Sequence, residues 1–317
     1  MKNLTYAAWL PFAWQGIQLM LPSDWNPGKI TGEANNGGVR LDDAQIVRLE
    51  LEWKEARGDD RVALIADRYI EGLAKNAEKQ KSKLKVERSA NLEGLDLPHM
   101  QNVEFFTWES NFIVYTLACY SPISDRLLFV RVMGRRDENL EGILPRILNS
   151  LTDTDPKAAQ QWTLYDMQCT SPPEYVLESF ELKSGHVRLK FEQGNNTLLI
   201  DRIGLAKTIL ANKQLDIWYP EFFGKDSRHI RIESQIEIAP DDNQSLTVTG
   251  KPKSRWRGLL QPLPFWNMRP RQYLTGRVWT DYEANKIFAV QSFWKKTEDA
   301  PDFETCVQSV RAVASQA

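Results

Sequence analysis

The sequence predicts an α+β protein of two similar domains, each an antiparallel β-sheet covered by α-helices. The first observation is length, because 317 residues suffice for two domains of ordinary size. The second is a polar, proline-containing segment at 150–161 that separates two strongly patterned regions and is typical of a linker. The third is the recurrence of period-two strands with a few helices in each region. We therefore expect domains at 1–151 and 160–317.

In the first half, residues 46–53 (IVRLELEW) alternate apolar and charged side chains, which indicates a half-buried strand. A helix is predicted next, because apolar residues recur at helical spacing from Val62 to Ala77, with Asp59 or Asp60 as its N-cap. Three strands separated by turn residues are predicted next, at 103–108, 111–120 and 127–133. A short helix near 138–150 completes the first half.

The second half repeats this order. Its predicted helix at 204–218 must end before Pro220, and a closing helix begins after Pro301. Its predicted strands include 187–191, 197–203 and the cleanly alternating run 229–238.

Short matches at one displacement support a duplication. Trp14 and Trp162 stand 148 positions apart, and each is followed by an alternating apolar triplet and then by proline. The tripeptide VRL at 39–41 recurs at 187–189 with the same displacement. The second domain is therefore predicted to share the topology of the first.

Residues 17–25 follow the pattern apolar-x-apolar-x-apolar-Pro-Ser-Asp-Trp. This pattern resembles the opening strand of the PsbP-like superfamily, which includes photosystem II extrinsic proteins and a Ran-binding nuclear transport factor. The resemblance covers the first half only, since Pro172 to Tyr175 replace the motif in the second. It implies a sheet sandwiched by helices and a non-catalytic accessory or binding role, and it transfers no partner-binding residue.

Charge and cysteine usage narrow the class of protein. Forty basic and 42 acidic residues give a net charge of −2, so no chain-wide field attracts nucleic acid or anionic lipid. Three cysteines, far apart and without metal-ligand spacing, predict a reduced cytoplasmic chain. No apolar run is long enough to predict a transmembrane segment.

No phosphate-binding loop, nucleophile elbow or metalloprotease motif is present, so we expect no cofactor, no metal and no catalytic residue. The scattered histidines and carboxylates are expected to be structural or solvated. They are His99, His186, His229, Asp153 and Asp155 of the linker, and Glu50 and Glu52 on the solvent face of one strand.

One segment departs from the neutral average. Residues 243–280 contain seven basic residues and no acidic one, with aromatics and prolines between them. We interpret 251–273 as a long loop inserted where the first half has only the short connection 121–125. Arginines and aromatics dominate interface hot spots. The candidate partner-binding residues are Arg255, Trp256, Arg257, Phe265, Trp266, Arg269 and Arg271.

Several interpretations of this segment, and of the function of the protein, stay open. Its aromatics can complete the core of its own domain while its arginines extend to water. The leading functional hypothesis is a non-catalytic interaction module for an unknown protein partner. The alternative is an anionic ligand, nucleic acid or a membrane surface, bound through 251–277. A third hypothesis is an enzyme whose site gathers dispersed histidines and carboxylates in space.

Overall fold

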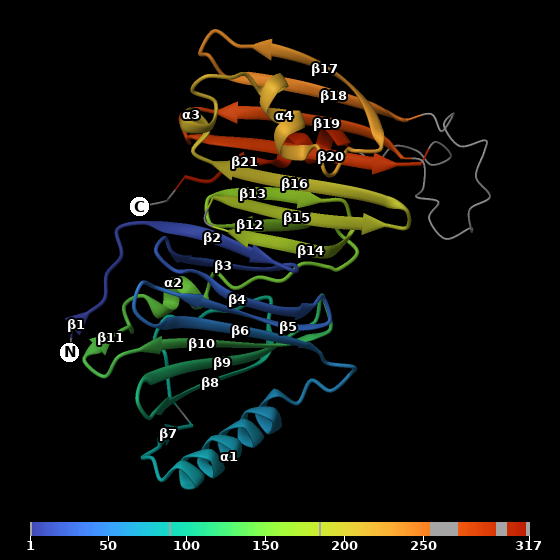
Figure 1. Ribbon diagram of the computed structural model, residues 1–317. Coiled ribbons are helices and arrows are strands. Elements are labelled where there is room, and N and C mark those ends of the chain that lie inside the picture. The colour runs from blue at the N-terminus through green and yellow to red at the C-terminus, as the bar shows by residue number, and fades with distance from the viewer. Residues whose placement is uncertain (1, 89, 184, 254–271, 296–302, 315–317) are drawn as a thin grey trace. The chain divides into compact units, whose positions relative to one another are not determined.

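The computed structural model describes residues 2–88, 90–183, 185–253, 272–295 and 303–314. The chain divides into two compact units. Unit 1 comprises Met1–Asp166 with Val313–Ala317, and unit 2 comprises Met167–Ala312. Each unit is built on a seven-stranded antiparallel sheet (Figure 1).

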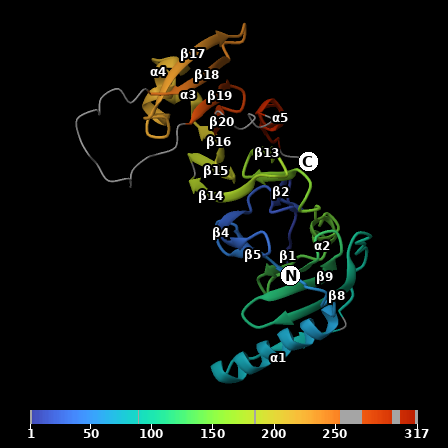
Figure 2. The ribbon, with the colours of Figure 1, turned by 90° about the vertical axis from the view of Figure 1, so that its right-hand side faces the viewer.

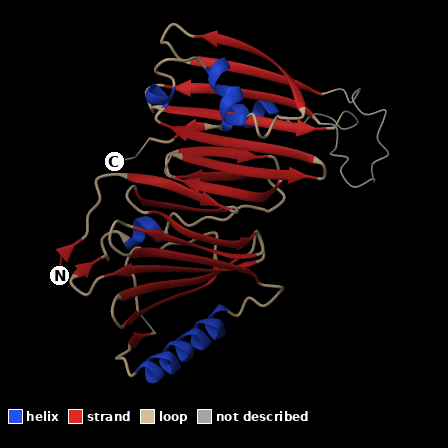
Figure 3. Cartoon of the chain, in the orientation of Figure 1, coloured by secondary structure: helices blue, strands red, loops and turns tan. Residues whose placement is uncertain are grey.

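The predicted α+β class is wrong, because strands make up 50% of the structure and helices only 15% (Figure 3). In the described residues only isolated helices pack on each sheet, and they do not form the predicted covering layer. Edge strands such as β4 (Asn26–Glu33) and β14 (Val176–Lys183) carry mostly exposed side chains. Both faces of these two strands are largely exposed, so their sequences lack a clear apolar alternation and the hydrophobic pattern did not reveal them.

The sheet of unit 1 has the order β4-β5-β6-β10-β9-β8-β7. Its register places Leu51, Val130 and Leu117 opposite one another on one face, where all three are buried. The neighbouring row, with Glu50 opposite Arg131, lies on the other face. The strands not yet bounded are β5 (Asn36–Asp42), β6 (Val47–Glu55), β7 (Lys85–Glu87), β8 (Gln101–Glu109), β9 (Ile113–Ser121) and β10 (Arg126–Gly134).

Helix α1 (Val62–Gln80) confirms the predicted helix and contacts β8 and β9, beside which both views place it (Figures 1 and 2). Its Tyr69 ring lies 6.1 Å from Phe106 and 5.9 Å from Phe129. The predicted acidic N-cap is wrong, because Arg61 occupies that position and makes no side-chain cap bond. Asp59 binds the Arg61 guanidinium instead.

Smaller elements complete unit 1. Strands β2 (Trp9–Trp14) and β3 (Ile17–Pro22) form a hairpin, and β12 (Gln160–Leu164) pairs with β2. The two tryptophans of the sequence repeat meet here, because the Trp14 and Trp162 rings pack edge to face with centroids 5.1 Å apart. The remaining elements are β1 (Lys2–Asn3), β11 (Glu138–Asn139) and α2 (Leu144–Leu148).

The predicted linker contains a buried carboxylate, so the expectation that Asp153 is solvated is wrong. Its side chain is 0% exposed and lies 3.6 Å from Arg126, whose side chain is 4% exposed. Ser124 donates a hydrogen bond to Asp153, and Arg126 donates one to the carbonyl of Gln15. Burial of this ion pair attaches residues 150–161 to unit 1.

Unit 2 has the same strand order, β14-β15-β16-β20-β19-β18-β17. The loop predicted at 251–273 connects β18 to β19, which correspond in order to β8 and β9. Its counterpart in unit 1 is therefore the turn at 110–112, and the predicted match with 121–125 is wrong. The strands are β15 (His186–Gln193), β16 (Asn196–Gly204), β17 (Ile230–Ile238), β18 (Gln244–Pro252), β19 (Tyr273–Asp281) and β20 (Lys286–Trp294), with β13 (Met167–Ser171) paired to β21 (Arg311–Ala312).

Two short helices, α3 (Ala206–Ile209) and α4 (Leu215–Phe223), replace the single helix expected before Pro220. Pro220 lies inside α4, where burial of Trp218, Tyr219 and Phe223 against the sheet outweighs the missing hydrogen bond. The closing helix α5 (Phe303–Ser309) begins close to its predicted start.

A buried ion network holds β6 to β11 in unit 1. Arg48, 4% exposed, donates from Nη1 to Glu138 Oε2 at 2.6 Å and from Nε to Asp43 Oδ2 at 2.5 Å. The backbone N–H of Arg135 also donates to Glu138, at 2.9 Å. Bonding to Arg48 holds the pKa of Glu138 below its ordinary value of 4.5, although burial acts in the opposite direction.

This network predicts an acid-sensitive stability. A carboxyl whose pKa falls on folding stabilises the protein above its unfolded pKa, and that contribution disappears as pH falls through the folded value. We expect Glu138→Gln to lower the free energy of unfolding by about 2 kcal/mol at about pH 6 and by much less at about pH 3. Urea unfolding at both values measures this. Glu141→Gln, at an exposed position, is the control, and an equal loss at both values would contradict the prediction.

Candidate functional site

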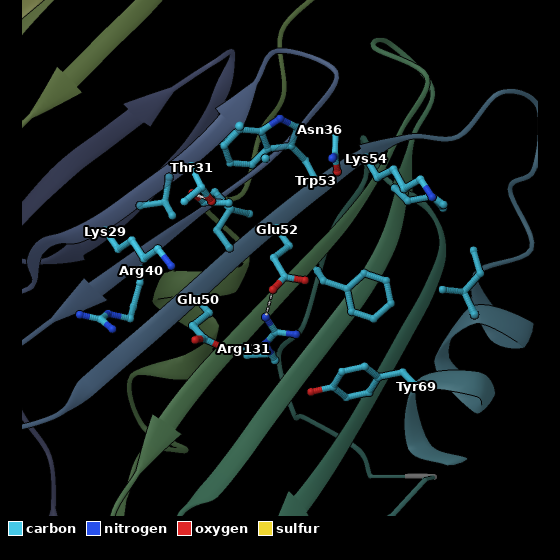
Figure 4. Close-up of a pocket in the computed structure, with 18 of the residues that line it drawn as sticks. Lys29, Thr31, Asn36, Arg40, Glu50, Glu52, Trp53, Lys54, Tyr69 and Arg131 are labelled. Atoms are coloured by element: carbon cyan, nitrogen blue, oxygen red, sulfur yellow. Dashed lines mark hydrogen bonds and ion pairs between the residues drawn. The ribbon is translucent and has the colours of Figure 1, made fainter. Parts of the chain in front are cut away.

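An open groove of about 840 Å³ lies on the charged face of the unit 1 sheet (Figure 4). Strands β4, β5, β6 and β10 form its floor, and α1 contributes Ile65, Arg68 and Tyr69. Lys29 and Arg40 lie toward one end of the groove and Lys54 toward the other (Figure 4). Because all these elements belong to unit 1, the groove is a property of that unit alone.

Two adjacent glycines in β5 keep the floor low. A Cβ at Gly38 would lie 3.3 Å from Glu52 Cγ, closer than most real contacts. A Cβ at Gly37 would lie 2.4 Å from the Trp53 ring on the opposite face, a separation that side chains do not adopt. Trp53 is itself fixed by a 2.9 Å hydrogen bond from Nε1 to the carbonyl of Glu33. The glycine pair therefore both seats this tryptophan and leaves space above β5.

Arg131 occupies the centre of the groove floor and is only 7% exposed. Its Nε lies 3.1 Å from Glu50, its Nη2 is bonded to Glu52, and its guanidinium carbon lies 5.7 Å from the Tyr69 ring centroid. Figure 4 shows Glu52 and Tyr69 both directed toward this guanidinium. Burial raises the pKa of the Tyr69 hydroxyl, and the nearby charge of Arg131 lowers it by a smaller amount. The net pKa lies above the ordinary value, so the phenol stays protonated at neutral pH. Burial works against the charge of Arg131, but Tyr69 and the two carboxylates outweigh it and raise its pKa.

The remaining lining is cationic. Five basic residues line the groove against two carboxylates, and both carboxylates are bonded to Arg131. Arg40 is bonded to Asp42 at 2.9 Å, while Lys29, Lys54 and Arg68 are exposed. The lining therefore carries more positive than negative charge, with Glu50 and Glu52 partly exposed among the basic side chains. Glu50 and Glu52 are partly solvated, as expected for the solvent face of the strand, and they also position a buried arginine.

In unit 2, aromatic side chains of α4 cover much of the corresponding face of the sheet. The repeated VRL motif places Arg188 opposite Asp201, as it places Arg40 opposite Glu50. Asp201 is fully buried and is contacted at 2.6 Å by both Arg188 Nε and His186 Nε2.

The aromatic end of α4 covers this cluster. Phe222 lies 5.3 Å from the His186 ring, and the guanidinium carbon of Arg188 lies 5.6 Å from the Phe223 centroid. A smaller pocket of about 270 Å³ remains, lined by two basic and two acidic side chains, Arg188, Lys190, Glu181 and Asp226. The charge excess of the unit 1 groove is thus absent from its counterpart.

The sequence prediction and the structure locate the site differently. All seven residues from Arg255 to Arg271 lie outside the described residues, so their partner-binding role stays a prediction. Of the three histidines, His186 is brought to a buried carboxylate, whereas His99 is exposed. The groove itself was missed, because it joins residues from β4, β5, β6, β10 and α1 that no local motif connects. The Gly37-Gly38 pair beside an alternating acidic strand was the one available signal.

Across the described ranges, no three histidine, cysteine or carboxylate side chains form a group able to hold a metal ion. None of the helices that the structure describes is long and apolar enough to cross a membrane. Comparison with protein-family models and with curated proteins finds no match. The likeness of residues 17–25 to the PsbP-like superfamily therefore remains a prediction.

The buried cluster of unit 2 yields a stability prediction. Asp201→Asn leaves Arg188 and His186 against a neutral amide, and breaking a buried ion pair costs about 3 kcal/mol. We expect this loss in the free energy of urea unfolding, followed by near-ultraviolet circular dichroism. Asp242→Asn, the same change at an exposed turn where asparagine tolerates the positive φ of 65°, should change stability by under about 0.5 kcal/mol. Equal effects of the two substitutions would contradict the assigned role of Asp201.

Proposed function

We propose that the chain is a non-catalytic binding module whose unit 1 groove holds an acidic segment of a partner protein. The observation that supports it is an open groove in which basic side chains outnumber carboxylates, both carboxylates already being bonded to Arg131. Its volume of about 840 Å³ falls in the range of ligand sites and accommodates several residues of extended chain.

The arrangement of the groove suits carboxylates spaced along a peptide. Arg68 offers a planar guanidinium group for paired hydrogen bonds, and Lys29 and Lys54 supply point charges at the two ends. Arg40 is already bonded to Asp42 through one nitrogen and adds positive charge beside Lys29. Thr31 and Asn36 add neutral groups able to bond a peptide backbone. Arg131, being held by its own acids, stiffens the floor rather than binding the ligand.

A protein segment is favoured over nucleic acid for two reasons. Continuous phosphates would approach Glu50 and Glu52 on the floor, which are 38% and 58% exposed as side chains and repel them. Single-strand binders also present free aromatic rings on which bases stack, whereas Trp53 is 2% exposed and the Tyr69 ring already packs against Arg131, Phe106 and Phe129. An acidic peptide can match the separate basic positions and avoid the two glutamates.

The test uses fluorescence anisotropy with a fluorescein-labelled peptide of alternating glutamate and glycine. We expect the full chain to bind it, and the double variant Lys29→Glu with Lys54→Glu to bind at least about tenfold more weakly, since about 1.4 kcal/mol corresponds to tenfold. Binding should also weaken as salt is added, because exposed charges are screened.

The matched control is Lys183→Glu with Lys207→Glu, two exposed lysines of unit 2 whose reversal changes the net charge equally. This control should bind the peptide as the wild type does. Equal weakening by both double variants would show that only overall charge matters and would overturn the groove assignment. Tighter binding of an oligothymidine than of the acidic peptide would replace the proposal with the nucleic-acid alternative.

A further inference from the structure

Strand β17, at one edge of the unit 2 sheet, differs from the other sheet edges. Natural proteins protect edge strands with proline, register breaks, short length or charged side chains, and of these β17 has only its charged side chains, Arg231, Glu233 and Glu237. Edge strand β4 has Pro27 and a register break beside it, β14 has a break between Leu177 and Ser179, and β7 has only three residues. Strand β17 has nine residues, no proline or glycine, and unbroken register with β18. Within the described residues its second edge pairs with no strand.

The hydrogen bonds flanking β17 show which backbone groups face that edge. The N–H of Ala239 donates to Asn243 at 2.8 Å, and the carbonyl of His229 accepts from Lys253 at 3.0 Å. Odd-numbered residues therefore bond to β18. Backbone N–H and C=O groups of successive residues point to opposite sides of a strand. The backbone groups of Ile232, Ser234 and Ile236 therefore point away from β18, toward the unpaired edge.

We propose that β17 pairs antiparallel with β17 of a second copy of this chain, with Ser234 opposite Ser234. In this register Arg231 stands opposite Glu237 and Ile232 opposite Ile236, each pair occurring twice by symmetry. Outward-facing residues meet outward-facing residues, so the hydrogen-bond ladder is complete. The contact uses the same strand in both copies and closes on itself as a two-fold dimer.

Other registers are unfavourable. A shift of two residues in one direction places Glu233 opposite Glu233, and in the other direction it places Glu233 opposite Glu237. A shift of one residue sets isoleucines against charged side chains and misaligns the outward backbone groups. Of these registers, only the one centred on Ser234 pairs opposite charges without also pairing like charges.

Burial adds to this complementarity. Ile232 and Ile236 already pack against the unit 2 core, but Ile238 is 53% exposed. Pairing places Ile238 opposite Ile230 of the second copy, which continues the apolar row and removes surface from water. Arg231 and Glu237 are both exposed, so their pairing requires no rearrangement of the unit.

The first test is crosslinking of Ser234→Cys. Residues opposite one another in a hydrogen-bonded pair have Cα atoms about 5.5 Å apart, which suits a disulfide. The three native cysteines are buried, so the introduced thiol is the accessible one. Under mild oxidation we expect a covalent dimer that forms at least about tenfold faster than with Ser179→Cys, the same change on the opposite edge strand β14. Equal rates would overturn the proposal.

The second test is a charge exchange followed by light scattering at increasing concentration. The wild-type mass should rise from 36.5 kDa toward twice that value. Arg231→Glu should weaken the dimer at least about tenfold, and Arg231→Glu with Glu237→Arg should restore it. A monomeric wild type, an unaffected single variant or a failure of the double variant to recover would each overturn self-pairing. A monomer would instead leave this edge to an extended segment of another protein.

Discussion

The register of the central strands is the constraint on which the rest of unit 1 depends. In β6, Leu49, Leu51 and Trp53 face the core while Glu50 and Glu52 face the groove, and β10 matches this alternation with Val130 and Arg131. Because side chains alternate with a period of two, a slip of one residue would bury both carboxylates and expose Trp53. The core and the charged groove are thus two consequences of one pairing.

The two units show how one sheet topology supports two different surfaces. Both place an arginine of the VRL motif opposite a carboxylate on the next strand. In unit 1 the following helix contributes Tyr69 beside Arg131, and the groove stays open. In unit 2 the following helix ends in Phe222 and Phe223, which cover the ion cluster. The helix that follows the third strand of each sheet, rather than the sheet itself, decides whether this face of the sheet is open or covered.

Local patterns predicted the elements whose stability is local. The helical spacing from Val62 and the alternation of β6 and β17 were both found in the structure. Prediction failed where contacts between residues far apart in the sequence determine the structure. Pro220 is tolerated inside α4 because the neighbouring aromatic side chains are buried. Asp153 is buried because it forms an ion pair with Arg126. The same limit explains the fold class and the groove, since neither edge strands that are exposed on both faces, such as β4 and β14, nor a site drawn from five elements leaves a continuous pattern in the sequence.

Strands β7 and β17 are the last strands of two sheets that have the same strand order, yet they differ greatly in length. Strand β7 has three residues and β17 has nine. A short strand therefore suffices to end such a sheet. Beyond Ile230, Ile232 and Ile236, which pack on the core, β17 adds exposed residues that contribute little to its own unit. Long edges without proline or a register break favour non-specific pairing, and in β17 only the charged side chains oppose it. The charge pattern of β17 would supply a defined partner in a second copy of the chain, because the register centred on Ser234 pairs Arg231 with Glu237 and sets no like charges opposite each other.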